Sequence, residues 1–323
     1  MAAGGREALV IGGGVSGLTT AVMLAEAGWR VRLWTAVPPE RTTSAVAAAI
    51  WYPYRAFPAD RVLAWGSRSL ALFGVLADDP ATGVGMIEGL ELSREPMPVP
   101  WWGPAVGSLR RATAAELPPG YGDGVAFTVP VIEMPVYLAY LVTRLRSAGG
   151  IIQQRRITTL AEAREACPLI VNCAGLGAAE LTGDASLFPI RGQVLRVANP
   201  GLTRFLLDDH HPEGVTYVVP RSRDVVLGGT AQLRSADLRP DPDIAASILR
   251  RCTALEPALR GAEVVGHAVG LRPGRQAVRL EAERLSGGGV CVHNYGHGGA
   301  GVTLSWGCAA AALELVMAAG LGR

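Results

Sequence analysis

Two glycine-rich segments have the spacing of turns that bind nucleotides. Near the start of the chain, Gly12, Gly14 and Gly17 follow an apolar run and precede an alanine-rich one, so this GxGxxG pattern lies between a predicted strand and a predicted helix. The first glycine allows the tight turn, the second lets the backbone approach a pyrophosphate, and the third lets helix and strand pack closely. The helix N-terminus then offers unpaired N–H groups and a partial positive charge to the phosphates. A glycine-rich turn that binds nothing is the less favoured alternative.

The acidic residue that commonly binds the adenosine ribose, about twenty residues after the glycines, is missing. Thr35 is found there instead, and its hydroxyl could bond to a ribose. This departure argues against a freely exchanging NAD and favours a cofactor held by many other contacts.

A second glycine loop, residues 296–301, again lies between a predicted strand and a predicted helix. Two such loops on one sheet predict a long ligand with two ends, as in flavoproteins, where a second helix can direct its positive end at the flavin. A structural turn is the alternative.

Two further segments contain residue types suited to binding. The run 41–54 combines hydroxyls, very small residues and then aromatic residues. Small side chains would let backbone amides reach a flat ring system, although a capped, alanine-rich helix start is equally compatible. In the segment 270–275, Arg272 lies between an apolar strand end and a proline turn, where a guanidinium could hold a carboxylate through two hydrogen bonds. An isolated arginine more often has a solvated or structural role.

Composition excludes several classes of chemistry. All 30 basic residues are arginine, so neither a pyridoxal-phosphate enzyme nor a Walker-type phosphate loop is possible without its lysine. The net charge of +2 predicts no nucleic-acid or acidic-membrane partner. Five scattered cysteines predict neither a disulfide framework nor a zinc site and fit a reducing, cytoplasmic location. The five histidines lack metal-ligand spacing, so no metal is expected, and no GxSxG elbow is present.

The elements that must position these residues follow an α/β order. Strands are predicted at 8–11, 30–35, 151–157, 169–173 and 290–295, and helices at 18–27, 136–147 and 304–319. The last helix is apolar but contains an acid and glycines, which predicts a buried helix rather than a membrane span. From 58 to 130 the sequence predicts short irregular strands without βα alternation, and from 191 to 263 an antiparallel sheet. At 323 residues, two domains are expected.

Seven stretches together resemble the D-amino-acid oxidase family, whose members are FAD-dependent flavoproteins of the glutathione-reductase-like, sarcosine-oxidase-related superfamily. They are VIGGGVSGL from Val10, TTSAVAAAIWYPY from Thr42, IVNCAGLGA from Ile170, RGQV from Arg191, VVLGGTAQ from Val225, GLRPGRQAVRLE from Gly270 and HNYGHGGAGVTLSWGCA from His293. The expected fold is a Rossmann-like FAD-binding domain with a spliced-in, mostly antiparallel β substrate domain. The FAD-binding domain comprises 1–57, 130–190 and 263–323, and the substrate-binding domain comprises 58–129 and 191–262.

The resemblance also implies roles for individual residues. Arg272 would bind the substrate carboxylate, Tyr217 would share that contact, and the Gly299 carbonyl would accept a hydrogen bond from the substrate amine. Tyr52 and Tyr54 would line the side-chain pocket. FAD would extend across both loops and contact Gly12, Gly14, Val15, Ser16, Gly17, Thr35, Thr42, Thr43, Ala49, Ile50, Ile157, Gly298, Gly299, Gly301, Val302 and Thr303.

The implied activity is oxidative deamination of D-amino acids to 2-oxo acids and ammonia, by hydride transfer to FAD and reoxidation by O₂ to hydrogen peroxide. A glycine, sarcosine or D-aspartate oxidase is an alternative, and for D-aspartate a second cation is required, for which Arg221, Arg223 and Arg275 are candidates. A flavin-binding protein without oxidase activity is another. The segment 210–215 lacks the second active-site tyrosine that the family carries on a lid. A homodimer is compatible with the sequence, which does not fix the oligomeric state.

Overall fold

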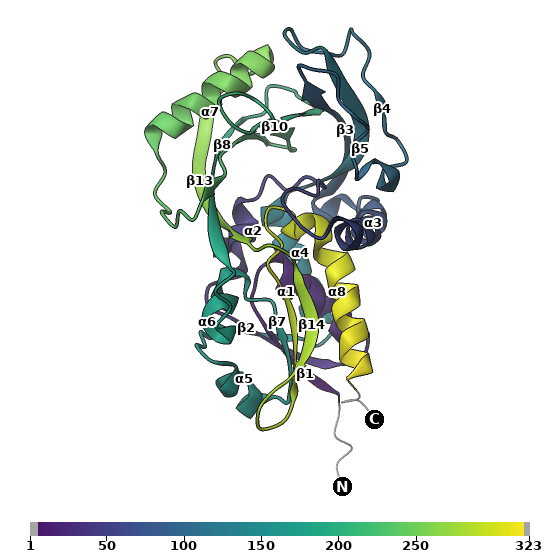
Figure 1. Cartoon of the computed structure of the whole chain (residues 1–323), viewed down its shortest axis with the longest axis vertical. Helices are drawn as coiled ribbons and strands as arrows, with labels where there is room; N and C mark the ends of the chain where they lie inside the picture. Colours follow the sequence, from purple (N-terminus) through teal and green to yellow (C-terminus); the bar gives the residue numbers. More distant parts are fainter. Residues whose placement is uncertain (1–5, 320–323) are drawn as a thin grey trace.

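Two β-sheets lie one above the other along the long axis of the molecule (Figure 1). This computed structural model describes residues 6–319. The smaller sheet has the strand order β14-β15-β7-β1-β2-β6, and only the β14–β15 pair is antiparallel. Its strands are β1 (Glu7–Ile11), β2 (Arg30–Thr35), β6 (Ile151–Gln154), β7 (Leu169–Asn172), β14 (Arg279–Arg284) and β15 (Val290–Tyr295). Central strands such as β1 and β7 are short apolar runs because helices cover a parallel sheet on its faces.

The helices around the small sheet pack on one another as well as on the sheet. They are α1 (Val15–Glu26), α2 (Thr43–Val46), α4 (Met134–Ser147), α5 (Leu160–Ala166), α6 (Ala178–Thr182) and α8 (Gly301–Ala318). Helix α1 contacts both α4 and α8. By length and composition α8 could cross a membrane, with a mean hydropathy of 1.5, but 61% of it is buried inside the structure. Helix α8 is therefore a buried core helix, as the sequence predicts. Its N-terminus lies at the upper end of the small sheet (Figure 1).

The larger sheet has nine strands and is antiparallel except where β3 pairs with β9. Its strands are β3 (Val84–Ser93), β4 (Arg110–Arg111), β5 (Asp123–Ile132), β8 (Phe188–Ala198), β9 (Phe205–Asp208), β10 (Thr216–Pro220), β11 (Asp224–Gly228), β12 (Gln232–Leu233) and β13 (Val264–Gly274). Helix α7 (Pro242–Leu255) packs on β8, β10 and β11. The predicted combination of an α/β part and a mostly antiparallel β part is confirmed.

The segment after residue 58 differs from its prediction. The structure has an 18-residue helix, α3 (Ala59–Leu76), where the sequence predicted short irregular strands. Its buried positions include Val62, Trp65, Ser69 and Phe73, which recur at the helical spacing of three and four residues. Surrounding proline and glycine residues obscured that period. Helix α3 packs against α8, so this part of the chain lies beside the small sheet although the following strands belong to the large one.

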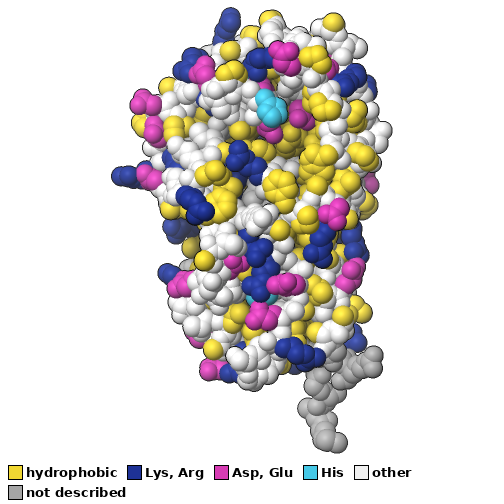
Figure 2. Space-filling model, viewed as in Figure 1, with side chains coloured by type: hydrophobic (Ala, Val, Ile, Leu, Met, Phe, Trp, Pro, Cys, Tyr) yellow, Lys and Arg dark blue, Asp and Glu magenta, His cyan; other side chains and the backbone are white. Residues whose placement is uncertain are grey.

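Charge is evenly distributed on the face shown in Figure 2. Acidic and basic side chains are interspersed there, while hydrophobic side chains gather on the upper half. This mixture agrees with the net charge of +2 for the whole sequence. All five cysteines are buried and unbridged.

Candidate active site

A cavity of about 700 Å³ lies between the two sheets, at the carboxyl ends of the parallel strands β1, β2 and β7. Ligands of open parallel sheets bind in this crevice because the loops that follow the strands converge there. Both glycine loops, the run 41–50 and residues 155–157 line the lower part of the cavity. Strands of the large sheet, through Tyr217 and Arg272 among others, line the upper part. One cavity thus joins the predicted cofactor loops to the predicted substrate residues.

The first glycine turn has the close contacts that its spacing predicts. Gly12 has a φ of +115°, and a Cβ there would lie 2.3 Å from the Cys173 carbonyl oxygen. A Cβ on Gly17 would lie 1.9 Å from the Gly12 carbonyl oxygen, so helix α1 can approach β1 only with glycine at that position. Gly17 serves this packing and does not line the cavity.

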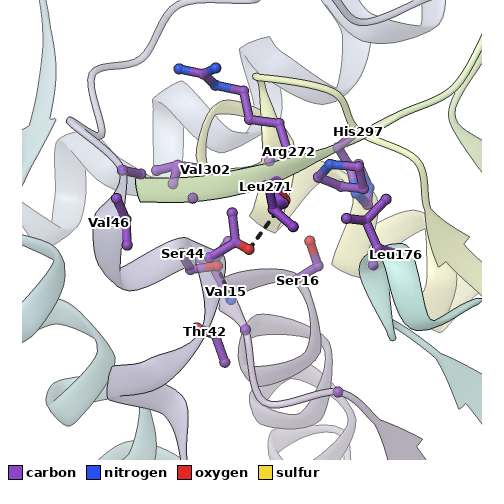
Figure 3. A pocket seen from close by; sticks show the side chains of 18 of the residues that line it. Val15, Ser16, Thr42, Ser44, Val46, Leu176, Leu271, Arg272, His297 and Val302 are labelled. Carbon is purple, nitrogen blue, oxygen red and sulfur yellow. Dashed lines mark hydrogen bonds between the residues drawn. The ribbon is translucent and has the colours of Figure 1, made fainter. Parts of the chain in front are cut away.

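The N-terminus of α1 is open to an anionic group. Gly14 lines the cavity with an ordinary φ of −77°, and a Cβ there would lie 3.1 Å from the Ser44 hydroxyl oxygen. The first turn of α1 has no acidic residue, and the Val15 N–H donates to Ser44 Oγ at 3.0 Å. Figure 3 shows Val15, Ser16 and Ser44 grouped at this helix end. A backbone cradle with a positive helix dipole and the small Ser44 hydroxyl beside it fits a pyrophosphate.

The end of the cavity near β2 is suited to an adenosine. The Thr35 hydroxyl donates to the Val37 carbonyl at 2.6 Å, so it can only accept from a ribose hydroxyl. Arg155 places its guanidinium 4.0 Å from the centroid of the Trp34 ring, and Arg156 also lines this end. Sequence reasoning missed these arginines because nothing in their spacing separates them from surface arginines.

The second glycine loop packs on the segment that follows Pro53. A Cβ on Gly298, whose φ is +55°, would lie 2.1 Å from the Arg55 carbonyl oxygen, and one on Gly299 would lie 2.5 Å from Cδ1 of Tyr54. Thr303, predicted to contact the cofactor, lies outside the cavity lining. Its hydroxyl donates to the Tyr52 carbonyl at 2.9 Å and accepts from the Tyr52 N–H at 3.0 Å. It therefore fastens the Tyr52 segment to the start of α8.

The other predicted cofactor-binding residues converge on this one cavity. Those that line it are Gly12, Gly14, Val15, Ser16, Thr35, Thr42, Thr43, Ala49, Ile50, Ile157, Gly298, Gly299, Gly301 and Val302. They come from both termini and from the middle of the sequence. Together with the open cradle at α1, this lining fits FAD in an extended conformation.

Strand β13 separates the cofactor part of the cavity from the substrate part. Because side chains alternate along a strand, Leu271 faces the Val15–Ser16 turn while the Arg272 guanidinium extends on the opposite side (Figure 3). Arg272 Nη1 donates to the Thr230 carbonyl at 2.9 Å. Within residues 6–319 no carboxylate lies within ion-pair distance of Arg272, so its other donors can bind an acidic ligand.

Tyr217 lies beside Arg272. A Cβ on Gly228 would be 2.0 Å from Cζ of Tyr217, so glycine in the neighbouring strand β11 leaves room for the ring. Burial raises the pKa of Tyr217, and the nearby guanidinium of Arg272 lowers it. The phenol therefore stays protonated near neutral pH and can donate a hydrogen bond to a carboxylate held by Arg272.

Tyr52 and Tyr54 both line the cavity, as predicted, but their hydroxyls differ in their partners. The Tyr52 hydroxyl donates to Oε1 of Glu91 at 3.0 Å. The Tyr54 hydroxyl is buried and has no hydrogen-bond partner among the described residues.

Asp209, which sequence reasoning did not single out, also lines the cavity. His297 lines it too, and burial lowers its pKa to about 4, so the imidazole is neutral near pH 7.

Burial raises the pKa of Glu91 to about 7 from an ordinary value of 4.5. The protonated form therefore favours the folded state. This stabilisation is fully present below about pH 4.5 and is lost as the pH rises through 7, by about 3 kcal/mol at most. We expect Glu91→Gln to flatten this part of the stability profile, measured by urea unfolding between pH 5 and pH 8. Glu88→Gln, an exposed acid on the same strand, is the control. Parallel profiles for wild type and Glu91→Gln would contradict the expectation.

The loop 209–215, between β9 and β10, covers one side of the cavity through Asp209 and Val215. Arg251 Nη2 donates to the Val215 carbonyl at 3.3 Å, and the Gly229 N–H donates to the same carbonyl at 2.7 Å. The candidates for a second cation lie elsewhere: Arg221 pairs with Asp224, Arg275 pairs with Asp184, and neither these two nor Arg223 lines the cavity.

Comparison with known proteins agrees with this geometry. Residues 7–315 match the family model described as FAD dependent oxidoreductase. The chain is 59% identical over 314 residues to a D-amino-acid oxidase of Rubrobacter xylanophilus, covering 97% of this chain and 96% of the relative. It is 49% identical to a D-amino-acid oxidase of Streptomyces coelicolor, covering 96% of each. Its fold is similar to a glycine oxidase from Geobacillus kaustophilus, with a TM-score of 0.81, 20% identity and coverage of 97% and 95%. The chain belongs to the FAD-dependent oxidoreductase family whose model it matches over nearly its whole length.

Proposed function

We propose that this protein oxidises D-amino acids to 2-oxo acids and ammonia, with O₂ as the final electron acceptor and hydrogen peroxide as a product. The observation that carries the proposal is the Arg272 guanidinium, which faces the same cavity as the cofactor cradle with no carboxylate partner in residues 6–319. The relatives named D-amino-acid oxidase support the D configuration.

The residues of this chain supply binding and orientation. Arg272 and the Tyr217 hydroxyl bind the substrate carboxylate, and the Gly299 carbonyl accepts a hydrogen bond from the neutral amine. These contacts fix the Cα–H toward the cofactor part of the cavity, and such positioning supplies much of the rate enhancement in reactions of this kind. Bound FAD supplies the hydride acceptor. No dedicated side-chain base is required, because the nitrogen lone pair assists departure of the hydride.

An anaerobic titration tests this proposal. FAD-loaded protein is mixed with D-alanine or L-alanine while the flavin absorbance is followed. We expect D-alanine to bleach the flavin and L-alanine to leave it oxidised. In air, peroxide, ammonia and pyruvate should then appear in equal amounts. A flavin that no amino acid bleaches would instead identify a flavin-binding protein without this activity.

A glycine, sarcosine or D-aspartate oxidase is the second candidate within this reaction class, and a substrate panel read by peroxide release distinguishes them. The D-aspartate alternative is disfavoured because the candidate second cations lie outside the cavity lining while an acid, Asp209, is part of it.

Five buried, unbridged cysteines and the buried helix α8 support a reducing cytoplasmic location.

A further inference from the structure

A pair of carboxylates lies at the part of the cavity formed by Tyr52 and Tyr54, and the chemistry proposed above does not use it. Glu91, on β3, is only 8% exposed, and its Oε2 is buried without a hydrogen-bond partner among the described residues. Asp209 directly follows β9 and lines the cavity. The Tyr52 hydroxyl donates to Glu91, and burial raises the pKa of this phenol, with further increases from the charges of Asp209 and Glu91. The hydroxyl thus connects Glu91, which lies behind the cavity wall, with Asp209, which is part of that wall.

Asp209 differs from the adjacent acid Asp208 in its charge balance. Its neighbour Asp208 is fully buried, pairs with Arg94 at 2.8 Å and accepts from the Tyr121 hydroxyl at 2.7 Å. For Asp209, no arginine lies within ion-pair distance in the part of the chain that the structure describes. Two basic residues act on it from further away: Arg55, whose guanidinium lies 5.2 Å from the Tyr54 ring centroid, and His210. Both are exposed to solvent, which screens them.

The position of Asp209 relative to Arg272 suits a substrate side chain. Burial has the largest effect on the pKa of the Tyr54 phenol and raises it. The charge of Asp209 raises this pKa further, and the charge of Arg272 lowers it. Tyr54, Arg272 and Asp209 also line the same cavity. The Tyr54 hydroxyl is buried without a partner among residues 6–319, and so is free to bind a polar group in the cavity. A substrate whose α-carboxylate is bound by Arg272 would extend its side chain past Tyr54 toward Asp209.

We propose that Asp209 is a specificity-determining residue that favours D-amino acids with a cationic side chain, an ammonium or a guanidinium, over neutral and acidic side chains of the same length. The proposal rests on the function proposed above. A cation would find in Asp209 a carboxylate that has no cation within ion-pair distance in residues 6–319, in a partly desolvated wall where charge attraction is stronger than in water. An acidic side chain would meet the Asp209 carboxylate, so like charges would oppose its binding.

Two pairs of substrates isolate the charge from the shape. D-lysine and D-norleucine share a four-carbon side chain and differ by the terminal ammonium, and D-glutamate and D-glutamine differ by one charge. We expect wild type to have the higher kcat/KM for D-lysine and for D-glutamine within each pair. In Asp209→Asn, the ratio of D-lysine to D-norleucine should fall about tenfold, and the ratio of D-glutamate to D-glutamine should rise by a similar factor.

Two further variants complete this experiment. Asp209→Glu should keep the preference because it keeps the charge. Asp243→Asn, which removes an exposed acid on α7 outside the cavity lining, should leave both ratios unchanged. If Asp209→Asn oxidises D-norleucine normally and keeps the wild-type ratios, Asp209 does not select for charge, although the proposed function would stand.

A binding measurement separates the two proposals in the other direction. The compounds 6-aminohexanoate and hexanoate are D-lysine and D-norleucine without the α-amine, so the enzyme cannot oxidise them at that position. Calorimetry on the FAD-loaded protein should give tighter binding of 6-aminohexanoate in wild type, with the preference reduced about tenfold in Asp209→Asn. If no D-amino acid is oxidised, the proposed function fails, whereas this ratio still tests Asp209. Equal affinities for the two compounds in wild type would overturn the inference.

Discussion

Replacing Arg272 by alanine is expected to lower kcat/KM for D-alanine by roughly 10²- to 10³-fold, mainly through a higher KM. The Arg272 side chain extends away from Val15 and Ser16 in Figure 3, and the Thr230 carbonyl holds one of its donors in place. Its removal leaves a bound carboxylate without a charge partner in a partly desolvated site. Such losses are large because neither water nor another side chain replaces the guanidinium.

Steady-state kinetics with two comparison variants tests this result. Arg272→Lys should recover only part of the loss, because an ammonium cannot form the paired, parallel hydrogen bonds of a guanidinium. Arg239→Ala removes an arginine whose side chain is 88% exposed and outside the cavity lining, and should behave as wild type. An Arg272→Ala protein with nearly unchanged kcat/KM would exclude the carboxylate contact on which the proposed function rests.

Replacing Gly14 by valine is expected to weaken FAD binding by about 100-fold or more, since the branched side chain would fill the space that the phosphates need next to the α1 N-terminus. The backbone at Gly14 has an ordinary φ of −77°, and a Cβ there would meet two side-chain hydroxyls and no backbone atom within 4 Å: Ser44 at 3.1 Å and Thr42 at 4.0 Å. The fold should therefore survive. Equilibrium dialysis of apoprotein with FAD, together with circular dichroism, measures binding and folding separately.

Gly28→Ala is a suitable control for this prediction. Gly28 has a φ of +85° and ends α1, but no atom lies within 4 Å of the position of a Cβ. The substitution should cost about 1 kcal/mol of stability through backbone strain and leave FAD affinity unchanged. If Gly14→Val folds and binds FAD as tightly as wild type, the pyrophosphate does not lie at this helix end.

The parts of the site that the sequence predicted best are those encoded locally. The first glycine turn needs only a strand, a turn and a helix in succession, and Gly12 and Gly17 have the contacts expected of them. The helix α3 was missed although its period is plain in the structure, because proline, glycine and tryptophan in the segment suggested short irregular strands. Local composition outweighed periodicity there, and periodicity was the better guide.

The parts that local patterns could not predict depend on pairing between distant strands. Glu91 and Asp209 come together because β3 pairs with β9, in register from Gly89 with Phe205 to Glu91 with Leu207. The sequence of neither strand indicates that β3 and β9 pair with each other. Arg272 and Tyr217 were assigned to one site through the family resemblance, and their proximity depends on β8 pairing with both β11 and β13.

The long pairing of β13 with β8, from Val264 with Val197 to Gly274 with Phe188, has a consequence for how this protein can change over evolutionary time. A one-residue insertion or deletion between Gly266 and Leu271 would exchange the faces of Leu271 and Arg272, turning a guanidinium toward the cofactor part of the cavity and an isobutyl group toward the substrate carboxylate. The register shift between Val264 and Gly266 shows where this pairing takes up an extra residue, outside the stretch that carries the site. Loops at the sheet ends should therefore hold nearly all the length variation among descendants of this sequence.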